Sequence, residues 1–280
     1  MSTDSQTDAP ANPNKALWEK GDFTRIAASM RESGEALVAA IGVTPGLDVL
    51  DLGCGDGTTA VPEAQAGANV LGVDIARNLV AAGNARAEQL GLSNLRFQEG
   101  DAMDLEDLSD DSFDLVVSIF GAMFAPRPDD VAREVVRVTR PGGRIVMGNW
   151  IPNDPTFVAQ LLRVSTAYSP PPPEGFVSPM TWGVADNVFE RFGAAGIPPE
   201  NIVFERVIYT FEFSGTPSEY LAEFRDYYGP TMNAYAAAAA AGREAELHGE
   251  LEALVDEHNT AASGEGTRIE AAFARVTVTV

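Results

Sequence analysis

The sequence has few of the groups that build covalent frameworks or metal centres. Its 280 residues include one cysteine and two histidines. A single cysteine excludes an intramolecular disulfide framework and a cysteine-rich zinc module. No apolar run approaches the ~20 residues that a membrane-spanning helix needs. No charged segment followed by an apolar one opens the chain, so the sequence predicts neither membrane insertion nor a secretory signal.

Basic residues are also scarce. Lysine and arginine number 19 against 41 aspartate and glutamate residues, which gives a formal charge of −22. Such a field repels phosphates, so neither nucleic acid nor an anionic membrane surface is expected as a partner. A hydrophobic share of 45% supports a full core. The sequence therefore predicts a soluble, cytoplasmic protein that acts on a small molecule.

Apolar runs and helical stretches alternate through the first half of the chain. Residues 1–13 are polar and predict a disordered tail, and residues 14–41 predict two helices. Strands are then predicted at 47–52, 69–73, 95–98, 113–119 and 144–149, with helices at 58–66, 76–90 and 129–139. This alternation indicates a mostly parallel sheet with helices on both faces.

The alternation ends after residue 150. Helices are predicted at 154–168 and 182–195, and long strands at 202–213 and 268–280. The segment between those two strands, residues 217–263, has helical composition and includes a run of alanines at 236–241.

The most informative segment is VLDLGCGDGT at residues 49–58. Gly53, Gly55 and Gly57 follow a buried strand at every second position, where their backbone can approach a ligand closely. A dinucleotide site has G-x-G-x-x-G instead. Asp51 would repel a pyrophosphate and attract an ammonium group, so the loop favours a ligand with a cationic amino-acid end.

Acidic residues also follow the second and third strands. Asp74 ends the second strand, where a carboxylate accepts hydrogen bonds from both hydroxyls of a ribose. Asp101 follows the third strand, and its carboxylate with the backbone N–H of Ala102 could bind the edge of an adenine. Ile75 and Met103 could cover the faces of the same ring.

Five motifs in this order resemble the class I S-adenosylmethionine-dependent methyltransferases, especially the small-molecule type related to quinone-biosynthesis methyltransferases. They are VLDLGCGDG (49–57), GVDIA (72–76), EGDAMDL (99–105), FDLVVSIFGAMF (113–124) and VTRPGGRIVMGNW (138–150). The resemblance implies an α/β, Rossmann-like fold with a seven-stranded, mostly parallel sheet, an antiparallel last strand and a helical cap. It also implies lid helices at 14–42 and a cofactor-binding core at 43–150. Residues 151–280 would form cap helices and a last β-hairpin with a helical insertion (215–265), all in the same domain.

The resemblance implies S-adenosylmethionine as cofactor, S-adenosylhomocysteine as product and no metal. The activity implied is methyl transfer to a small, partly apolar molecule by in-line displacement. The cofactor-binding residues implied are Asp51 near the amino group, Gly53 and Gly55 at the methionine part, Asp74 at the ribose, Ile75, Asp101 and Ala102 at the adenine, and Ser118 on the methionine side.

Aromatic residues outside the cofactor motifs are the candidates for binding the methyl acceptor. They are Trp18, Phe120, Phe124, Trp150, Trp182 and Tyr227. An activated methyl needs little acid–base help, so no catalytic residue is assigned. His258 shares a helical stripe with Leu247 and Leu251, which fits either a buried core histidine or a general base.

Several alternatives stay open. A protein that binds the cofactor without turning it over would carry the same motifs. An NAD(P)-dependent oxidoreductase is disfavoured by the glycine spacing and by Asp51. The segment Ser118–Gly121 lacks the Asn/Asp-Pro-Pro-aromatic run of enzymes that methylate base amino groups. The acceptor atom, any general base, and the choice between monomer and homodimer are beyond the sequence.

Overall fold

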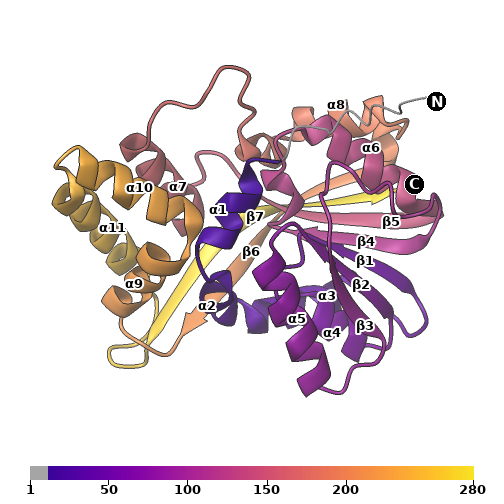
Figure 1. Cartoon of the computed structure of the whole chain (residues 1–280), viewed down its shortest axis with the longest axis horizontal. Helices are drawn as coiled ribbons and strands as arrows, with labels where there is room; N and C mark the ends of the chain where they lie inside the picture. Colours follow the sequence, from indigo (N-terminus) through magenta and orange to yellow (C-terminus); the bar gives the residue numbers. More distant parts are fainter. Residues whose placement is uncertain (1–11) are drawn as a thin grey trace, which may run out of the picture.

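The computed structural model describes residues 12–280, in which seven strands form one sheet in the order β3-β2-β1-β4-β5-β7-β6. The first five strands are parallel, and β7 is antiparallel to both β5 and β6 (Figure 1). The strands are β1 (Asp48–Leu52), β2 (Asn69–Asp74), β3 (Leu95–Glu99), β4 (Phe113–Ile119), β5 (Thr139–Trp150), β6 (Ile202–Phe213) and β7 (Thr267–Thr279). The predicted α/β class, the mostly parallel sheet and its antiparallel last strand are confirmed. The predicted tail lies outside the described residues except for Asn12 and Pro13.

One strand differs from its prediction. β5 begins at Thr139, five residues before the predicted start at residue 144. Thr139 pairs with Phe113 on β4, and the following glycines exchange backbone hydrogen bonds with Val280. The Pro-Gly-Gly segment therefore joins the strand as an irregular part of the ladder, with Gly142 at φ +79°, because Val280 supplies hydrogen-bond partners that sequence spacing does not reveal.

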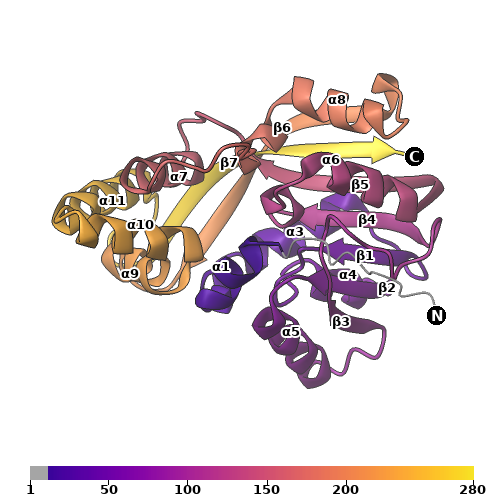
Figure 2. The ribbon, with the colours of Figure 1, turned by 45° about the horizontal axis from the view of Figure 1, so that its top comes forward.

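Helices cover both faces of the parallel strands, as expected (Figure 2). Helices α3 (Arg31–Ile41), α4 (Ala60–Gln65) and α5 (Arg77–Gln89) lie on one face, and α6 (Pro128–Val138) and α8 (Ala185–Ala194) on the other. Helix α6 starts with Pro128 at its first turn, followed by Asp129 and Asp130, and has Arg137 in its last turn. These charges complement the helix dipole, and its buried valines and alanine pack on the sheet.

Three N-terminal helices stand where two are predicted: α1 (Asn14–Lys20), α2 (Phe23–Ala28) and α3. Gly21 is extended and ends α1, and the Asp22 carboxylate then caps α2 by accepting the N–H of Thr24. This break turns α1 away, so that it contacts α5 and the distant helix α10 (Gly229–Ala240).

The far halves of β6 and β7 extend beyond the parallel strands and carry a group of helices (Figure 1). This helical lobe consists of α7 (Phe157–Tyr168), α9 (Pro217–Tyr227), α10 and α11 (Glu244–His258). Helix α9 starts with a capping box, in which Thr216 and Glu219 satisfy each other's backbone N–H groups. Helices α1 and α2 lie between the lobe and the sheet, in contact with α10 and α9. The part of the chain that the structure describes also contains three short 3-10 turns, at Ala122–Phe124, Pro179–Gly183 and Pro199–Asn201.

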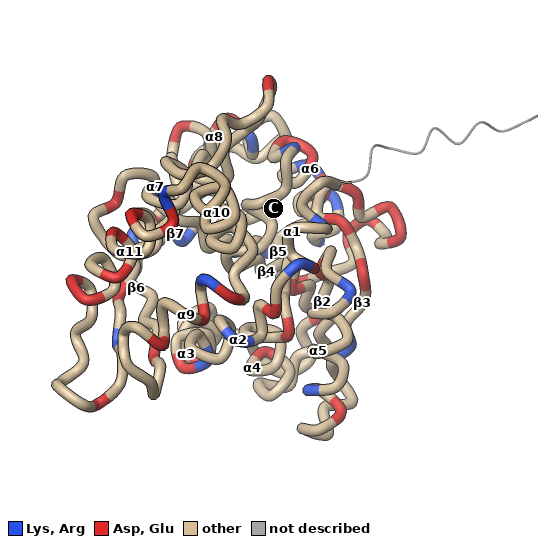
Figure 3. Tube along the Cα trace, turned by 60° about the vertical axis from the view of Figure 1, so that its left-hand side comes forward, with Lys and Arg blue, Asp and Glu red and all other residues tan. Residues whose placement is uncertain are grey.

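Acidic positions are spread over the sheet-bearing part and the helical lobe alike (Figure 3). Many of the basic side chains already pair with them, as Arg137 does with Asp110 and Glu134. Among residues 12–280, no helix is long and apolar enough to cross a membrane.

Candidate functional site

A pocket lies at the carboxyl ends of β1 to β4, beneath the N-terminal helices. It encloses about 930 Å³ of space, the open solvent at its mouth included. Ligands of open α/β sheets bind at this edge, where the strand order reverses. The lining residues are Asn12, Asn14, Trp18, Phe23, Met30, Leu52–Asp56, Thr58, Thr59, Val73–Ile75, Leu79, Gly100–Ala102, Ile119–Ala122, Phe124, Ala125 and Tyr209.

The glycine loop forms the floor of the pocket. Gly53 has φ +68°, and a Cβ there would meet the Cα of Gly121 at 2.6 Å, so this position brings the loops after β1 and β4 together. Gly55 has φ +56°, and a Cβ there would meet only the ring of Phe23, at 4.0 Å. The loop thus presents bare backbone to open space below α2, as a closely approaching ligand requires.

Asp74 holds this loop against the end of β2. Its carboxylate accepts the N–H of Gly55 at 2.8 Å and the N–H of Ala76 at 2.9 Å. Burial raises the pKa of this carboxyl above its ordinary value, although the backbone donors oppose the shift. Asp74 is one of the pocket residues, as predicted from its place at the strand end.

Asp101 and its neighbours form the wall after β3. The Asp101 carboxylate accepts the Nδ2 of Asn12 at 3.1 Å and the N–H of Met103 at 3.0 Å. Ala102 and Ile75 also line the pocket, whereas Met103 is buried behind it. Asn12, which the sequence places in the tail, therefore ties the N-terminal segment to this wall.

Two of the predicted cofactor residues do not line the pocket. Asp51 is fully buried and directs its carboxylate to the hydroxyl of Thr59, at 2.6 Å. Ser118 donates to the carbonyl of Leu52 at 2.6 Å and accepts the N–H of Ala122 at 2.9 Å. Both side chains brace the loops that follow β1 and β4.

Aromatic rings cover the pocket from the N-terminal helices. Trp18 packs edge-on against Phe23 and Phe124, with ring centroids 5.8 and 5.0 Å apart. Tyr228 lies 6.0 Å from Trp18 and links this group to the helical lobe. Three chain segments far apart in sequence therefore close the same side of the pocket.

Phe120 forms the wall after β4. Its φ of +58° is unusual for a residue with a side chain, and its N–H is held by the carbonyl of Gly148. The ring stacks on Trp150 at 3.7 Å and meets the edges of Tyr209 and Phe273, each at 5.2 Å. Trp150 is thus behind Phe120 and supports it without lining the pocket itself.

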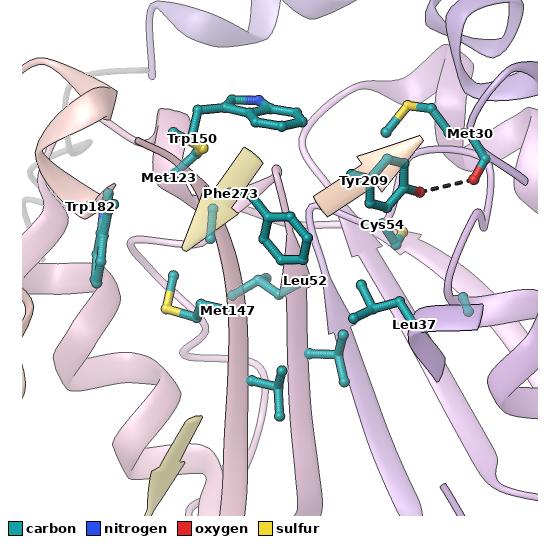
Figure 4. Close-up of a cluster of buried hydrophobic side chains, with 14 of the residues drawn as sticks. Met30, Leu37, Leu52, Cys54, Met123, Met147, Trp150, Trp182, Tyr209 and Phe273 are labelled. Carbon is teal, nitrogen blue, oxygen red and sulfur yellow. Dashed lines mark hydrogen bonds between the residues drawn. The ribbon is translucent and has the colours of Figure 1, made fainter. Parts of the chain in front are cut away.

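Three predicted site residues lie elsewhere. Trp182 is 1% exposed and packs with Arg191 and Phe192 on the other face of the sheet; Figure 4 draws it far from Met30 and Tyr209. Tyr227 lies under the guanidinium of Arg25. His258 ends α11 in the helical lobe, with its ring 6.1 Å from that of Phe157. None of the three lines the pocket.

Sequence reasoning missed Tyr209, Met30, Asn12 and Asp56. The hydroxyl of Tyr209 donates to the carbonyl of Met30 at 2.9 Å, which joins β6 to the turn between α2 and α3 (Figure 4). No local pattern brings residues 179 positions apart together. Asp56 is different, because its place inside the glycine motif was a signal that could have been used.

Comparisons with known proteins agree with this geometry. A family model described as "Methyltransferase domain" matches residues 50–147. The uncharacterized protein Rv1403c of Mycobacterium tuberculosis is 36% identical over 232 residues, which cover 82% of each chain. Demethylmenaquinone methyltransferase of Renibacterium salmoninarum is 33% identical over 159 residues, or 56% of this chain and 64% of the relative. The YcgJ protein of Bacillus subtilis shares the fold, with a TM-score of 0.54, 20% identity, and coverage of 89% of this chain and 97% of that one.

Proposed function

The chain belongs to the S-adenosylmethionine-dependent methyltransferases, and from this we propose that it methylates a small, partly apolar acceptor in the pocket at the ends of β1 to β4. The observation that carries the proposal is that one pocket contains the carboxylates of Asp56, Asp74 and Asp101, a bare glycine loop and a wall of aromatic rings. The carboxylates suit the polar cofactor, and the rings suit an apolar acceptor.

The residues of the pocket fit the cofactor. Asp74, at the end of β2, suits the ribose hydroxyls, and Asp101 with the Ala102 backbone suits the adenine edge, beside the apolar Ile75. The space above Gly55, which a Cβ would partly fill, suits the methionine chain. The cofactor supplies, when bound, a methyl group already activated by its sulfonium.

The N-terminal helices α1, α2 and α3 act as a lid in this proposal. Asn12 bonds to Asp101, and Asn14 bonds to the carbonyl of Phe124, so the start of α1 is fastened across the pocket mouth. Trp18 lines the pocket and packs edge-on against Phe124. Closing the mouth excludes water and holds the acceptor in line at the ~3–3.5 Å that a transfer needs.

The acceptor side consists of Phe120, Phe124, Trp18 and Tyr209. Among residues 12–280, the side chains that line the pocket include no lysine, arginine or histidine. A carboxylate or phosphate on the acceptor would be buried there without a cation, at a cost of several kcal/mol. An uncharged acceptor is therefore favoured. A relative named for demethylmenaquinone supports a small-molecule acceptor.

Two experiments test the proposal. Isothermal titration should detect S-adenosylmethionine binding, and Asp101→Asn should weaken this binding. A wild-type protein that does not bind the cofactor would contradict the proposal. Incubation with a metabolite extract should then generate S-adenosylhomocysteine. Cofactor binding without product from any extract would favour the alternative of a non-catalytic binding protein.

A further inference from the structure

The resemblance to the family assigns the cofactor's ammonium group to Asp51, but the side chain of Asp51 is sealed from the pocket. It is 0% exposed, and its carboxylate faces Thr59 and the start of α4. Glu63, one turn further along α4, is also 0% exposed, and neither of its carboxylate oxygens has a hydrogen-bond partner among residues 12–280. A cofactor in the pocket cannot reach Asp51 without displacing this packing.

Burial disfavours the charge of both carboxyl groups. Burial, and then the charge of Asp74, raises the pKa of Asp51 to about 7. Burial, and then the charge of Asp51, raises the pKa of Glu63 well above its ordinary value. Asp51 is therefore poorly suited to provide the fixed negative charge that an ammonium needs.

Asp56 differs from Asp51 in its position, although the Oδ1 of each carboxylate has no hydrogen-bond partner among residues 12–280. It lines the pocket within the glycine loop, although only 6% of it is exposed. Its Oδ2 pairs with the guanidinium of Arg31 at the start of α3, and Arg31 also donates to the hydroxyl of Thr58 at 2.7 Å. Its Oδ1 has no hydrogen-bond partner among the described residues. A buried carboxylate oxygen without a donor costs free energy that a ligand donor would recover.

The order of groups along the pocket places Asp56 at the amino-acid end. Asp101 follows β3, Asp74 ends β2, and Asp56 follows β1, and these three strands are neighbours in the sheet. The Gly55 N–H bonds to Asp74, so the two loops are adjacent. An adenine at Asp101 and a ribose at Asp74 therefore direct the remaining part of the cofactor to the loop that contains Asp56.

We propose that Asp56, held by Arg31 of the lid, receives the ammonium group of the cofactor's amino-acid end, and that Asp51 does not. This assignment rests on the proposed function, since it requires the pocket to bind S-adenosylmethionine. Arg31 is a positioning residue, because it fixes one carboxylate oxygen of Asp56 and leaves the other for the ligand. It also connects ligand binding at the loop to the position of α3.

The test compares two ligands that differ at one end. S-adenosylhomocysteine carries the amino-acid group, whereas 5′-methylthioadenosine has the same adenosine and thioether without it. Isothermal titration with Asp56→Asn should show S-adenosylhomocysteine binding weakened by about tenfold to a hundredfold, the usual range for a lost hydrogen bond to a charged group. Binding of 5′-methylthioadenosine should stay within about twofold. In Asp51→Asn, any change should be equal for the two ligands.

Arg31 supplies a second pair of variants, which serves also if Asp56→Asn fails to fold. Arg31→Met should weaken the binding of S-adenosylhomocysteine but not that of 5′-methylthioadenosine, and Arg31→Lys should restore much of the lost affinity. Equal weakening of both ligands in Asp56→Asn and Arg31→Met would show a merely structural role and overturn the assignment, as would a selective loss in Asp51→Asn. A wild-type protein that binds neither ligand would refute the proposed function itself, and this assignment with it.

Discussion

Gly53 is the position where a single methyl group should damage both the fold and the cofactor site. In Gly53→Ala the new Cβ would stand 2.6 Å from the Cα and 2.9 Å from the carbonyl carbon of Gly121, and 3.0 Å from the nitrogen of Ala122. All three are backbone atoms, so no side-chain rotation relieves the contact. The loop after β4, including Phe120, must move away from the loop after β1.

The expected cost has two parts. An alanine at φ +68° carries the left-handed penalty of about 1–2 kcal/mol. Forcing the backbone apart in a packed site adds about 1–3 kcal/mol. Gly53→Ala should therefore lower the free energy of unfolding by roughly 2–5 kcal/mol. The affinity for S-adenosylhomocysteine should also fall at least about tenfold. A loss of about 1.4 kcal/mol in binding free energy, caused by the displaced pocket wall, is enough for that.

Gly42 provides the matched control. It has φ +75° at the end of α3, and a Cβ there would meet nothing within 4 Å. Gly42→Ala should thus incur only the conformational penalty of about 1–2 kcal/mol and leave ligand affinity unchanged. Urea unfolding gives the two free energies, and isothermal titration gives the affinities.

If Gly53→Ala is no less stable than Gly42→Ala, the contact with Gly121 costs nothing and this prediction is wrong. Gly53→Ala that is destabilised but binds S-adenosylhomocysteine like the wild type would also contradict it. In that case the junction of the two loops would support the fold without shaping the pocket.

Three further predictions follow from named contacts. Tyr209→Phe removes the donor to the buried carbonyl of Met30 and should lower the free energy of unfolding in urea by about 1–2 kcal/mol. An unchanged free energy would mean that this hydrogen bond between β6 and the lid does not stabilise the fold. Because the folded state holds the Asp51 carboxyl at a pKa of about 7 against an ordinary 3.8, it keeps a proton that the unfolded chain releases. Wild-type stability relative to Asp51→Asn should therefore fall as the pH rises from about 4 to 7 and level off above, whereas a rise over that interval would contradict the buried carboxyl. With S-adenosylhomocysteine bound, 2-naphthol should bind at least about tenfold more tightly than 2-naphthoate in isothermal titration, since no pocket side chain of residues 12–280 offers a cation; equal or reversed affinities would reject an uncharged acceptor.

Much of the fold could be predicted from the sequence because its signals are local. The bounds of β4 agree with their prediction, since a buried strand is a continuous apolar run between turn residues. The bounds of β6 also agree, although this strand lies at the edge of the sheet and few of its residues are buried. The glycine loop could likewise be identified, because its backbone conformation requires residues without a Cβ. The start of β5 could not, because its first residues join the sheet only through pairing with Phe113 and Val280.

The composition of the pocket depends on tertiary contacts. Trp18 and Trp182 look alike as isolated aromatics, yet one covers the pocket and the other packs on the opposite face of the sheet. His258 has the periodicity of a core residue, and the helical lobe that holds it is carried away from the pocket by β6 and β7.

The sequence by itself determined that a glycine loop between a buried strand and a helix has one acidic residue before it, Asp51, and one within it, Asp56. Only the tertiary structure decided which of the two faces the pocket. Asp51 belongs to a strand whose alternate side chains point toward α4, so its carboxylate is buried against Thr59. Asp56 lies between Gly55 and Gly57, and Arg31, 25 residues earlier in the chain, holds it at the pocket wall.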